Sequence, residues 1–182
     1  LSSDAVYGSS NRVVSENLTP SPDTTYGQMH LSREAIFSKF GDRLAIVRPT
    51  MVVGAADPHD AYGPNRFIRT ALNDKEVTLF GEGEELRDYV ALEDLIPIIA
   101  EISLSQKTGI WNVASGDSYT FLEIASKILT YLPETRLRRV ERKIKLTHRE
   151  FKPLRIRAEL QSQPSNIMTV LKRRFEECDA EI

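Results

Sequence analysis

The sequence predicts an α/β fold, because short apolar segments alternate with a helical pattern along its first fifty residues. An extended strand end at Leu1–Gly8, a helix over Tyr26–Phe40 and a strand at Leu44–Val47 follow in that order. A strand, a helix and a strand in succession are typical of a parallel βαβ unit. With 182 residues and 41% hydrophobic side chains, the chain is long and apolar enough to form a core.

The first helix is predicted from its two ends and its periodicity. Thr24 or Thr25 can cap its start, and Gly41 ends it. The stretch before it, Ser9–Asp23, is polar, contains two prolines and is predicted to be a loop. The apolar residues that are expected to contact the core from this helix are Met29, Ile36 and Phe40.

Two further helices and two strands are predicted in the middle of the chain. Pro64 suits the first position of a helix, and Glu76–Phe80 alternates like a strand. A strand at Asp88–Leu92 leads into a helix at Glu93–Leu104. The side chains expected to be buried are Phe67, Ile68, Ala71 and Leu72 on the first helix, and Leu95, Ile96, Ile99 and Ile102 on the second.

The last third of the chain continues this alternation and then becomes basic. A strand is predicted at Ile110–Val113, and Thr120 with Glu123 forms a capping box. The helix that follows is expected to bury Leu122, Ala125, Leu129 and Leu132. The basic segment Arg136–Arg157 is interpreted as a solvated strand-and-loop face rather than a nucleic-acid patch, because no stacking aromatic residues are interleaved with its charges. A last helix is predicted over Ser165–Glu177.

The first chemical signal is a tyrosine and a histidine one helical turn apart. Residues four apart share a helix face, so Tyr26 and His30 are predicted to point the same way. A free tyrosine titrates near ~10, and a neighbouring cation brings its pKa towards the range of a general base. His30 supplies that charge only when protonated, and otherwise offers a neutral hydrogen bond. On this pair alone, two surface residues on an ordinary amphipathic helix are the alternative.

Five motifs in order extend this signal over roughly residues 1 to 130. They are Ser3-x-x-Val6-Tyr7-Gly8, Tyr26-Gly27-x-x-His30-Leu31-x-x-Glu34, Val47-Arg48-Pro49-Thr50-x-Val52-Val53-Gly54, Phe80-Gly81-Glu82-Gly83-x-x-x-Arg87-Asp88-Tyr89-Val90 and Trp111-Asn112-Val113-Ala114-Ser115-Gly116. Together they resemble the extended short-chain dehydrogenase/reductase family, whose best-known members are nucleotide-sugar epimerases and dehydratases.

The resemblance implies a fold, a cofactor and three catalytic residues. It implies the C-terminal part of a Rossmann-type parallel sheet in residues 1–50, and in residues 51–182 a small substrate-binding α/β subdomain with some segments returning to the sheet. The cofactor would be NAD or NADP. Ser3, Tyr26 and His30 would be catalytic, with Ser3 and Tyr26 sharing one substrate oxygen. Tyr26, His30 and Pro49 would contact the cofactor.

The resemblance also implies a nucleotide-diphosphate sugar as substrate, held by Ser3, Tyr7, Asn65, Arg66 and Arg87. Asn65 and Arg66 are predicted in the first turn of a helix, where free N–H groups favour an anion, although a solvated turn is an equal alternative. Arg87 presents a fork that matches two phosphate oxygens. Without the surrounding motif, an ion pair between Arg87 and Asp88 would be the simpler reading.

Two departures from the family pattern bear on the activity. His30 stands where the catalytic motif has lysine, and Ala5 stands where the sugar 4,6-dehydratases carry a glutamate. The missing glutamate argues against dehydratase chemistry. The expected function is therefore an NAD(P)-dependent nucleotide-sugar epimerase, 4-epimerase-like, with a sugar reductase next. His30 supports an alternative, a catalytically impaired member that only binds a nucleotide sugar or a partner.

Composition sets further expectations on partners and location. The net charge of −2 and the absence of a long apolar segment predict no nucleic-acid and no membrane partner. A lone cysteine, Cys178, suits a reducing compartment, so a cytoplasmic location is expected. No metal site is predicted: Asp57, His59 and Asp60 lie close in sequence, but a polar loop is the simpler interpretation.

The start of the chain and the resemblance lead to two last expectations. The sequence begins at Leu1, at the end of a predicted strand, and contains no G-x-G-x-x-G dinucleotide motif. It is therefore interpreted as a fragment that lacks an upstream half. Pairing through the active-site helix is common in the family, so a homodimer is an expectation.

Overall fold

The structure is a computed structural model that describes residues 1–54 and 62–179. Its strands are β1 Val13–Val14, β2 Ala45–Pro49, β3 Met51–Val53, β4 Glu76–Phe80, β5 Leu86–Arg87, β6 Tyr89–Ala91, β7 Gly109–Val113, β8 Tyr119–Thr120, β9 Arg136–Val140 and β10 Glu150–Phe151. Its α-helices are α1 Thr25–Phe37, α2 Pro64–Asp74, α3 Leu92–Leu104, α4 Phe121–Tyr131, α5 Leu154–Glu159 and α6 Ile167–Asp179. Two 3₁₀-helices, η1 Asp4–Tyr7 and η2 Ser38–Arg43, complete the set.

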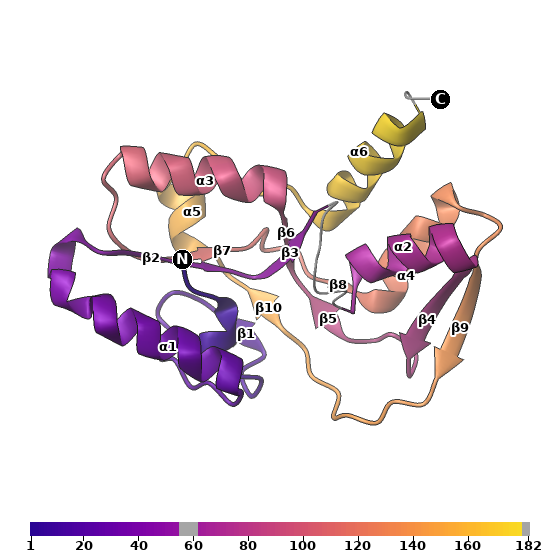
Figure 1. The fold of residues 1–182 in the computed structure, drawn as a ribbon, viewed down its shortest axis with the longest axis horizontal. Helices are drawn as coiled ribbons and strands as arrows, with labels where there is room; N and C mark the ends of the chain where they lie inside the picture. Colours follow the sequence, from indigo (N-terminus) through magenta and orange to yellow (C-terminus); the bar gives the residue numbers. More distant parts are fainter. Residues whose placement is uncertain (55–61, 180–182) are drawn as a thin grey trace.

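Parallel strand pairs form the centre of the molecule, as the α/β prediction requires. β2 pairs with β7, where Val47 lies opposite Trp111, and β3 pairs with β6, where Val52 lies opposite Val90. β3 begins two residues after β2 ends, so the two follow one another along the middle of the molecule (Figure 1). α3 lies on one side of this central line and α1 on the other (Figure 1). The α/β fold class is confirmed.

Two main apolar clusters hold these layers together. One joins β2, β6 and β7 to α3 and α5, with Trp111 and Ile98 fully buried in it. The other joins α2, α4 and α6 to β4, around Phe67, Ile124 and Leu171. The capping box that opens α4 is present as predicted, because the Thr120 side chain accepts from Glu123 N and the Glu123 side chain accepts from Thr120 N.

The N-terminal segment differs from its prediction. Leu1–Gly8 was expected to end a strand, but residues 4–7 form η1 instead. Ser3 explains the change, since its side chain accepts a hydrogen bond from Ala5 N at 3.2 Å and caps the 3₁₀ turn. One strand-like contact remains, in which Ser2 N donates to Val47 O of β2 at 2.7 Å.

The prediction for α1 is right about its cap and wrong about its buried face. The Thr24 side chain accepts from Gly27 N at 3.1 Å, whereas the α-helix ends at Phe37, before Gly41. The stripe expected in the core is exposed: Met29 by 46%, Ile36 by 65% and Phe40 by 42%. The buried residues of the helix are Gly27, His30 and Glu34. The close approach of Gly27 to the Ala5 backbone and the ion pair of Glu34 with Arg48 determine which face of the helix is buried, against the apolar pattern.

Smaller corrections concern the burial pattern of other helices. Leu72 of α2 and Ile96 of α3 were expected in the core but are 50% and 58% exposed, and Ile98 takes the buried position on α3. α3 begins at Leu92, one residue earlier than predicted, which leaves β6 shorter than expected. In α4 the central buried residues are Phe121, Ile124, Ala125 and Ile128, while Leu122, Leu129 and Leu132 pack against them at the edge.

The basic segment begins with an exposed strand, as predicted, because the side chains of Arg136, Arg138 and Arg139 are 79%, 62% and 45% exposed, whereas that of Arg142 is only 11% exposed. β9 pairs in parallel with β4, and Arg142 bridges Glu84 and Glu85 at 2.9 and 2.8 Å. The predicted cluster of Asp57, His59 and Asp60 lies outside the described residues. Among the helices that the structure describes, none combines the length and apolarity needed to cross a membrane.

Candidate active site

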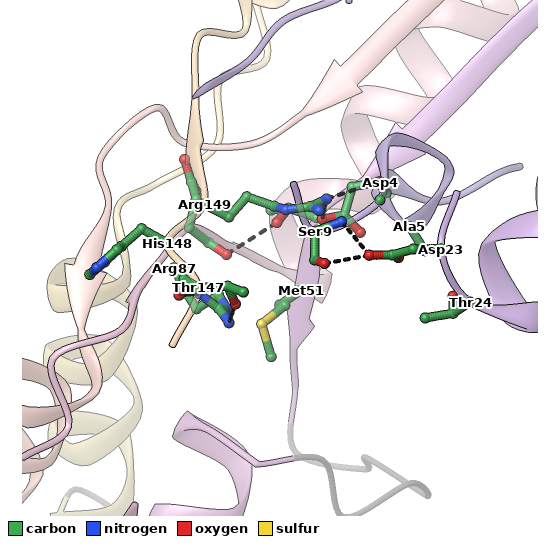
Figure 2. A pocket seen from close by; sticks show the side chains of 13 residues that line it. Asp4, Ala5, Ser9, Asp23, Thr24, Met51, Arg87, Thr147, His148 and Arg149 are labelled. Atoms are coloured by element: carbon green, nitrogen blue, oxygen red, sulfur yellow. Dashed lines mark hydrogen bonds and ion pairs between the residues drawn. The ribbon is translucent and has the colours of Figure 1, made fainter. Parts of the chain in front are cut away.

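A cavity of about 250 Å³ opens where the N-terminal segment meets the start of β3, the β5–β6 junction and the chain before β10 (Figure 2). Segments that are distant in the sequence therefore line one cavity. The residues that line it are Asp4, Ala5, Gly8, Ser9, Asp23, Thr24, Thr50, Met51, Arg87, Asp88, Thr147, His148 and Arg149.

Two carboxylates lie on the N-terminal side of the cavity. Asp4 accepts from Arg149 Nη1, which is 3.4 Å from its Oδ2 and 3.0 Å from its backbone oxygen. Burial raises the pKa of Asp4, and Arg149 and Ser3 oppose that shift. Asp23 accepts from both the backbone N–H and the hydroxyl of Ser9, which lowers the pKa of Asp23 and closes the loop between them (Figure 2).

Arg87 and Arg149 supply positive charge from the other side. Arg87 Nη1 donates to the Thr147 backbone oxygen at 2.7 Å, and Nη2 donates to the Thr147 hydroxyl at 2.9 Å. Arg87 also lies 3.8 Å from Glu85. The alternative ion pair of Arg87 with Asp88 does not explain this geometry, because Asp88 takes its hydrogen bonds elsewhere.

Asp88 ties the cavity to the turn after β7. Its carboxylate accepts from Ser115 N, Ser115 Oγ and Gly116 N at 2.9, 2.8 and 2.7 Å. Only 1% of the residue is exposed, and this burial raises its pKa to about 6 despite those donors. Asp88 is therefore a buried cavity carboxyl whose pKa lies well above that of an exposed aspartate.

None of the predicted catalytic residues, Ser3, Tyr26 and His30, is among the residues that line this cavity. The Tyr26 and His30 rings meet edge-on with 4.5 Å between centroids, which confirms that they share a helix face. Tyr26 is 57% exposed, whereas His30 is 6% exposed. η1 lies against the first turn of α1: a Cβ at Gly27 would be 2.4 Å from Ala5 O. Ser3, which caps η1, is thereby held near the start of the Tyr26 helix.

The remaining predicted residues are dispersed. Tyr7 is fully buried, and its hydroxyl accepts from Arg48 Nη1 and donates to Asn112 Oδ1, each at 2.8 Å. Pro49 is buried at the end of β2. Asn65 bonds to the backbone at the end of β3, where it accepts from Gly54 N at 3.2 Å. Arg66 is exposed on a separate hollow beside Tyr62. Of the predicted substrate-binding residues, only Arg87 lines the cavity.

The comparisons with known proteins fit this geometry. The family model described as NAD dependent epimerase/dehydratase family matches residues 1–114. This chain belongs to that family. The resemblance to the extended short-chain dehydrogenases/reductases is thus confirmed.

Curated relatives of the epimerase/dehydratase family share part of the chain. A protein of Bacillus subtilis named as an uncharacterized UDP-glucose epimerase, YtcB, is 32% identical over 106 residues, covering 56% of this chain and 33% of its own. A dTDP-4-dehydro-6-deoxy-D-allose reductase of Streptomyces bikiniensis is 28% identical over 116 residues, covering 59% and 33%. The aligned region thus spans about a third of the length of these relatives.

Solved structures of the family show the same fold. ADP-L-glycero-D-manno-heptose-6-epimerase of Helicobacter pylori has a TM-score of 0.85 at 23% identity, covering 100% of this chain and 59% of that one. The UDP-N-acetylglucosamine 4-epimerase of Methanobrevibacter ruminantium M1, solved with UDP-N-acetylmuramic acid, has a TM-score of 0.84 at 21% identity, covering 100% and 62%. MoeE5, solved with UDP-glucose and NAD, has a TM-score of 0.82 at 21% identity, covering 99% of this chain and 64% of that one.

The cofactor of the family is NAD(P), as predicted. His30 Nδ1 is buried, and within the described part of the chain it has no hydrogen-bond partner. A buried polar atom without a partner costs free energy. Tyr26, next to it, is 57% exposed. Contact of Tyr26, His30 and Pro49 with the cofactor stays a prediction from the resemblance.

Sequence reasoning missed Asp4, Asp88 and Arg149 as cavity residues. Arg149 was one charge in the basic segment Arg136–Arg157, which was interpreted as a solvated strand-and-loop face. Asp4 and Asp88 stood inside motifs whose other residues drew attention. One signal in the sequence could have identified Asp4 and Asp88. Both lie inside motifs of the same ordered set, and motifs that form one site bring their charged residues into that site.

Proposed function

We propose that this chain forms the catalytic and substrate-binding part of an NAD(P)-dependent nucleotide-sugar epimerase, 4-epimerase-like, or a related sugar oxidoreductase. One observation carries the proposal. A single cavity takes residues next to Ser3 and the cap of the Tyr26 helix on one side, and Arg87 and Arg149 on the other. The residues proposed to react are thus sequence neighbours of residues lining the cavity that also contains the arginines proposed to bind phosphate.

In this proposal the proton chemistry belongs to Ser3 and Tyr26. The Tyr26 phenolate takes the proton of a sugar hydroxyl, and Ser3 holds the same oxygen. NAD(P), when bound, would supply a hydride acceptor and donor for the carbon that carries this hydroxyl. Tyr26 would hold the proton taken from the hydroxyl and return it to the same oxygen. Ala5 offers no acid or base for loss of water.

The diphosphate is assigned to Arg87 and Arg149. Guanidinium groups bind phosphate oxygens in pairs, and both arginines line the cavity. Arg87 is already oriented by Thr147, so little side-chain entropy remains to be lost on binding. The relatives support the substrate class, because MoeE5 was solved with UDP-glucose.

A second candidate is a member of the family that binds the sugar nucleotide without turning it over. The pKa of His30 is lowered, first by burial and then by Arg33, with Glu34 opposing. His30 is therefore neutral at physiological pH and supplies no cation to Tyr26. This observation favours the binding role over catalysis by a lysine-like residue.

The proposal also covers assembly and location. The exposed apolar residues Met29 and Ile36 of α1 and Phe40 of the following η2 support a homodimer that pairs through this helix. A cytoplasmic location rests on the single cysteine of the sequence.

Turnover of the full-length protein decides between the two candidates. The protein is incubated with NAD and a panel of UDP- and dTDP-sugars from about pH 5.5 to about pH 9, and conversion of the sugar is measured. Conversion that disappears in Tyr26→Phe supports the enzyme. Sugar-nucleotide binding without conversion at any pH, with conversion appearing in His30→Lys, supports the binding protein. Failure to bind any sugar nucleotide rejects both.

A further inference from the structure

A buried polar network lies behind the cavity, with Arg48 of β2 at its centre. Arg48 is 2% exposed, and its Nε and Nη2 form a fork on the Glu34 carboxylate at 2.9 and 2.6 Å. Its third nitrogen, Nη1, donates to the Tyr7 hydroxyl at 2.8 Å. Glu34 Oε1 also accepts from the Ser2 hydroxyl at 2.5 Å. One ion pair therefore joins β2, α1, η1 and the N-terminal segment.

The two ends of this network flank the turn that Ser3 caps. Ser2 directly precedes Ser3, and Tyr7 ends the 3₁₀ turn that Ser3 caps. Glu34 lies on the buried face of α1 together with His30, one turn further along the helix than His30. No residue of the network lines the cavity. The network thus holds both sides of the Ser3 turn against the helix that carries Tyr26 and His30.

Stability alone is a weak reason for such a network. A buried ion pair loses the hydration of both charges, and apolar residues of similar size often match or exceed its contribution to folding. A pair of apolar residues would not fix the orientation of the two elements that carry them. A guanidinium that bonds a carboxylate through two nitrogens does fix that orientation. The α1 residues that would bury apolar surface instead face outwards. The network, together with Gly27, accounts for how α1 is oriented.

We propose that Arg48 and Glu34 are positioning residues that couple the Ser3 turn to the Tyr26 helix. The catalytic consequence rests on the proposed function, because misplacing Ser3 or Tyr26 lowers the rate of the chemical step. The coupling itself is a property of the fold and can be measured without turnover.

The first test uses Glu34→Gln, which keeps the shape of the side chain and removes its charge. Hydrogen exchange is followed in peptides covering residues 1–8 and 25–37 of the full-length protein. Coupling predicts that exchange rises at least about tenfold in both peptides together. With sugar nucleotide and NAD, kcat is expected to fall about 10- to 100-fold while KM changes little, since the diphosphate site is untouched.

Glu159→Gln is the matched control. Arg155 donates to both oxygens of Glu159, from Nε at 2.7 Å and from Nη2 at 3.0 Å, and its guanidinium stacks on Trp111. These contacts involve neither the Ser3 turn nor α1. Exchange in residues 1–8 and 25–37 and kcat are expected to match the wild type.

The double variant Glu34→Leu/Arg48→Met separates positioning from stability, because it buries no charge. The expected result is an unfolding midpoint close to the wild type, together with faster exchange in residues 1–8 and lower kcat. A double variant with wild-type exchange and kcat overturns the proposal, as does Glu34→Gln if exchange rises in α1 alone. If the wild type converts no nucleotide sugar, the proposed function fails, and the exchange results alone decide the coupling.

Discussion

His30 meets the ring of Tyr26 edge-on, with 4.5 Å between the centroids and 70° between the planes. The contact places a buried imidazole, whose pKa is lowered by burial, beside the Tyr26 ring. Its consequence is electrostatic, because a neutral neighbour does little to stabilise a tyrosine phenolate.

Replacing His30 by lysine is expected to increase turnover near neutral pH. A lysine cation stabilises the Tyr26 phenolate, so the rising limb of the pH–rate profile should move to lower pH by about one unit. The measurement is kcat/KM against pH for the full-length protein. His30→Gln, which offers only a neutral hydrogen bond, is the control and should keep the wild-type profile. A profile unchanged in His30→Lys would remove the electrostatic role.

The same histidine should make stability depend on pH. The folded-state pKa of His30 lies below its ordinary value, because burial disfavours the charged form. The unfolded chain therefore takes up the proton more readily, and the contribution of neutral His30 is present above about pH 6.5 and lost as the pH falls. Urea unfolding of the wild type and His30→Gln at several pH values should show the wild type losing more stability in acid.

Replacing Arg87 by lysine is expected to weaken binding of UDP about 10- to 100-fold, because a lysine keeps the charge and loses the fork. Calorimetric titration with UDP measures the change. Arg12→Lys is the control, since Arg12 pairs with Glu150 on the surface, away from the cavity lining. Equal affinities for Arg87→Lys and the wild type would exclude Arg87 from the diphosphate site.

Gly27→Ala is expected to destabilise the fold although alanine favours helices. The added Cβ would lie 2.4 Å from Ala5 O and 2.9 Å from Pro22 Cβ, so η1 would have to move. We expect a loss of about 1–3 kcal/mol from overpacking instead of a gain of about 1 kcal/mol from helix propensity. Chemical denaturation measures it, with the exposed Gln28→Ala in the same turn as the control. Increased stability in Gly27→Ala would contradict the close contact of η1 and α1.

Asp88 should make the wild type less stable as the pH rises from about 4 to about 7, relative to Asp88→Asn. Burial raises its pKa from 3.8 to about 6, so the folded protein holds the proton more tightly than the unfolded chain. The stabilisation is complete below the unfolded pKa and disappears as the pH passes the folded one. The difference between the two unfolding free energies should shrink by up to about 3 kcal/mol. Asp74→Asn, at the exposed end of α2, is the control.

Much of the fold could be predicted because its signals are local. The strand Glu76–Phe80 and the capping box of α4 were predicted correctly, since alternation and capping depend on residues within one turn or strand. The cavity could be predicted only in part. Arg87 was found through its motif, whereas Arg149 lies 145 residues from its partner Asp4, a separation that no local pattern encodes.

The sequence by itself determined the parallel α/β class and the shared helix face of Tyr26 and His30, because both follow from spacing along the chain. The tertiary structure decided which side of α1 is buried and which charges meet. The apolar pattern predicted that the face with Met29 and Ile36 is buried. The contact at Gly27 and the Arg48–Glu34 pair bury the face with Gly27, His30 and Glu34 instead. Local periodicity names the candidate faces of a helix, and the partner available in three dimensions selects between them.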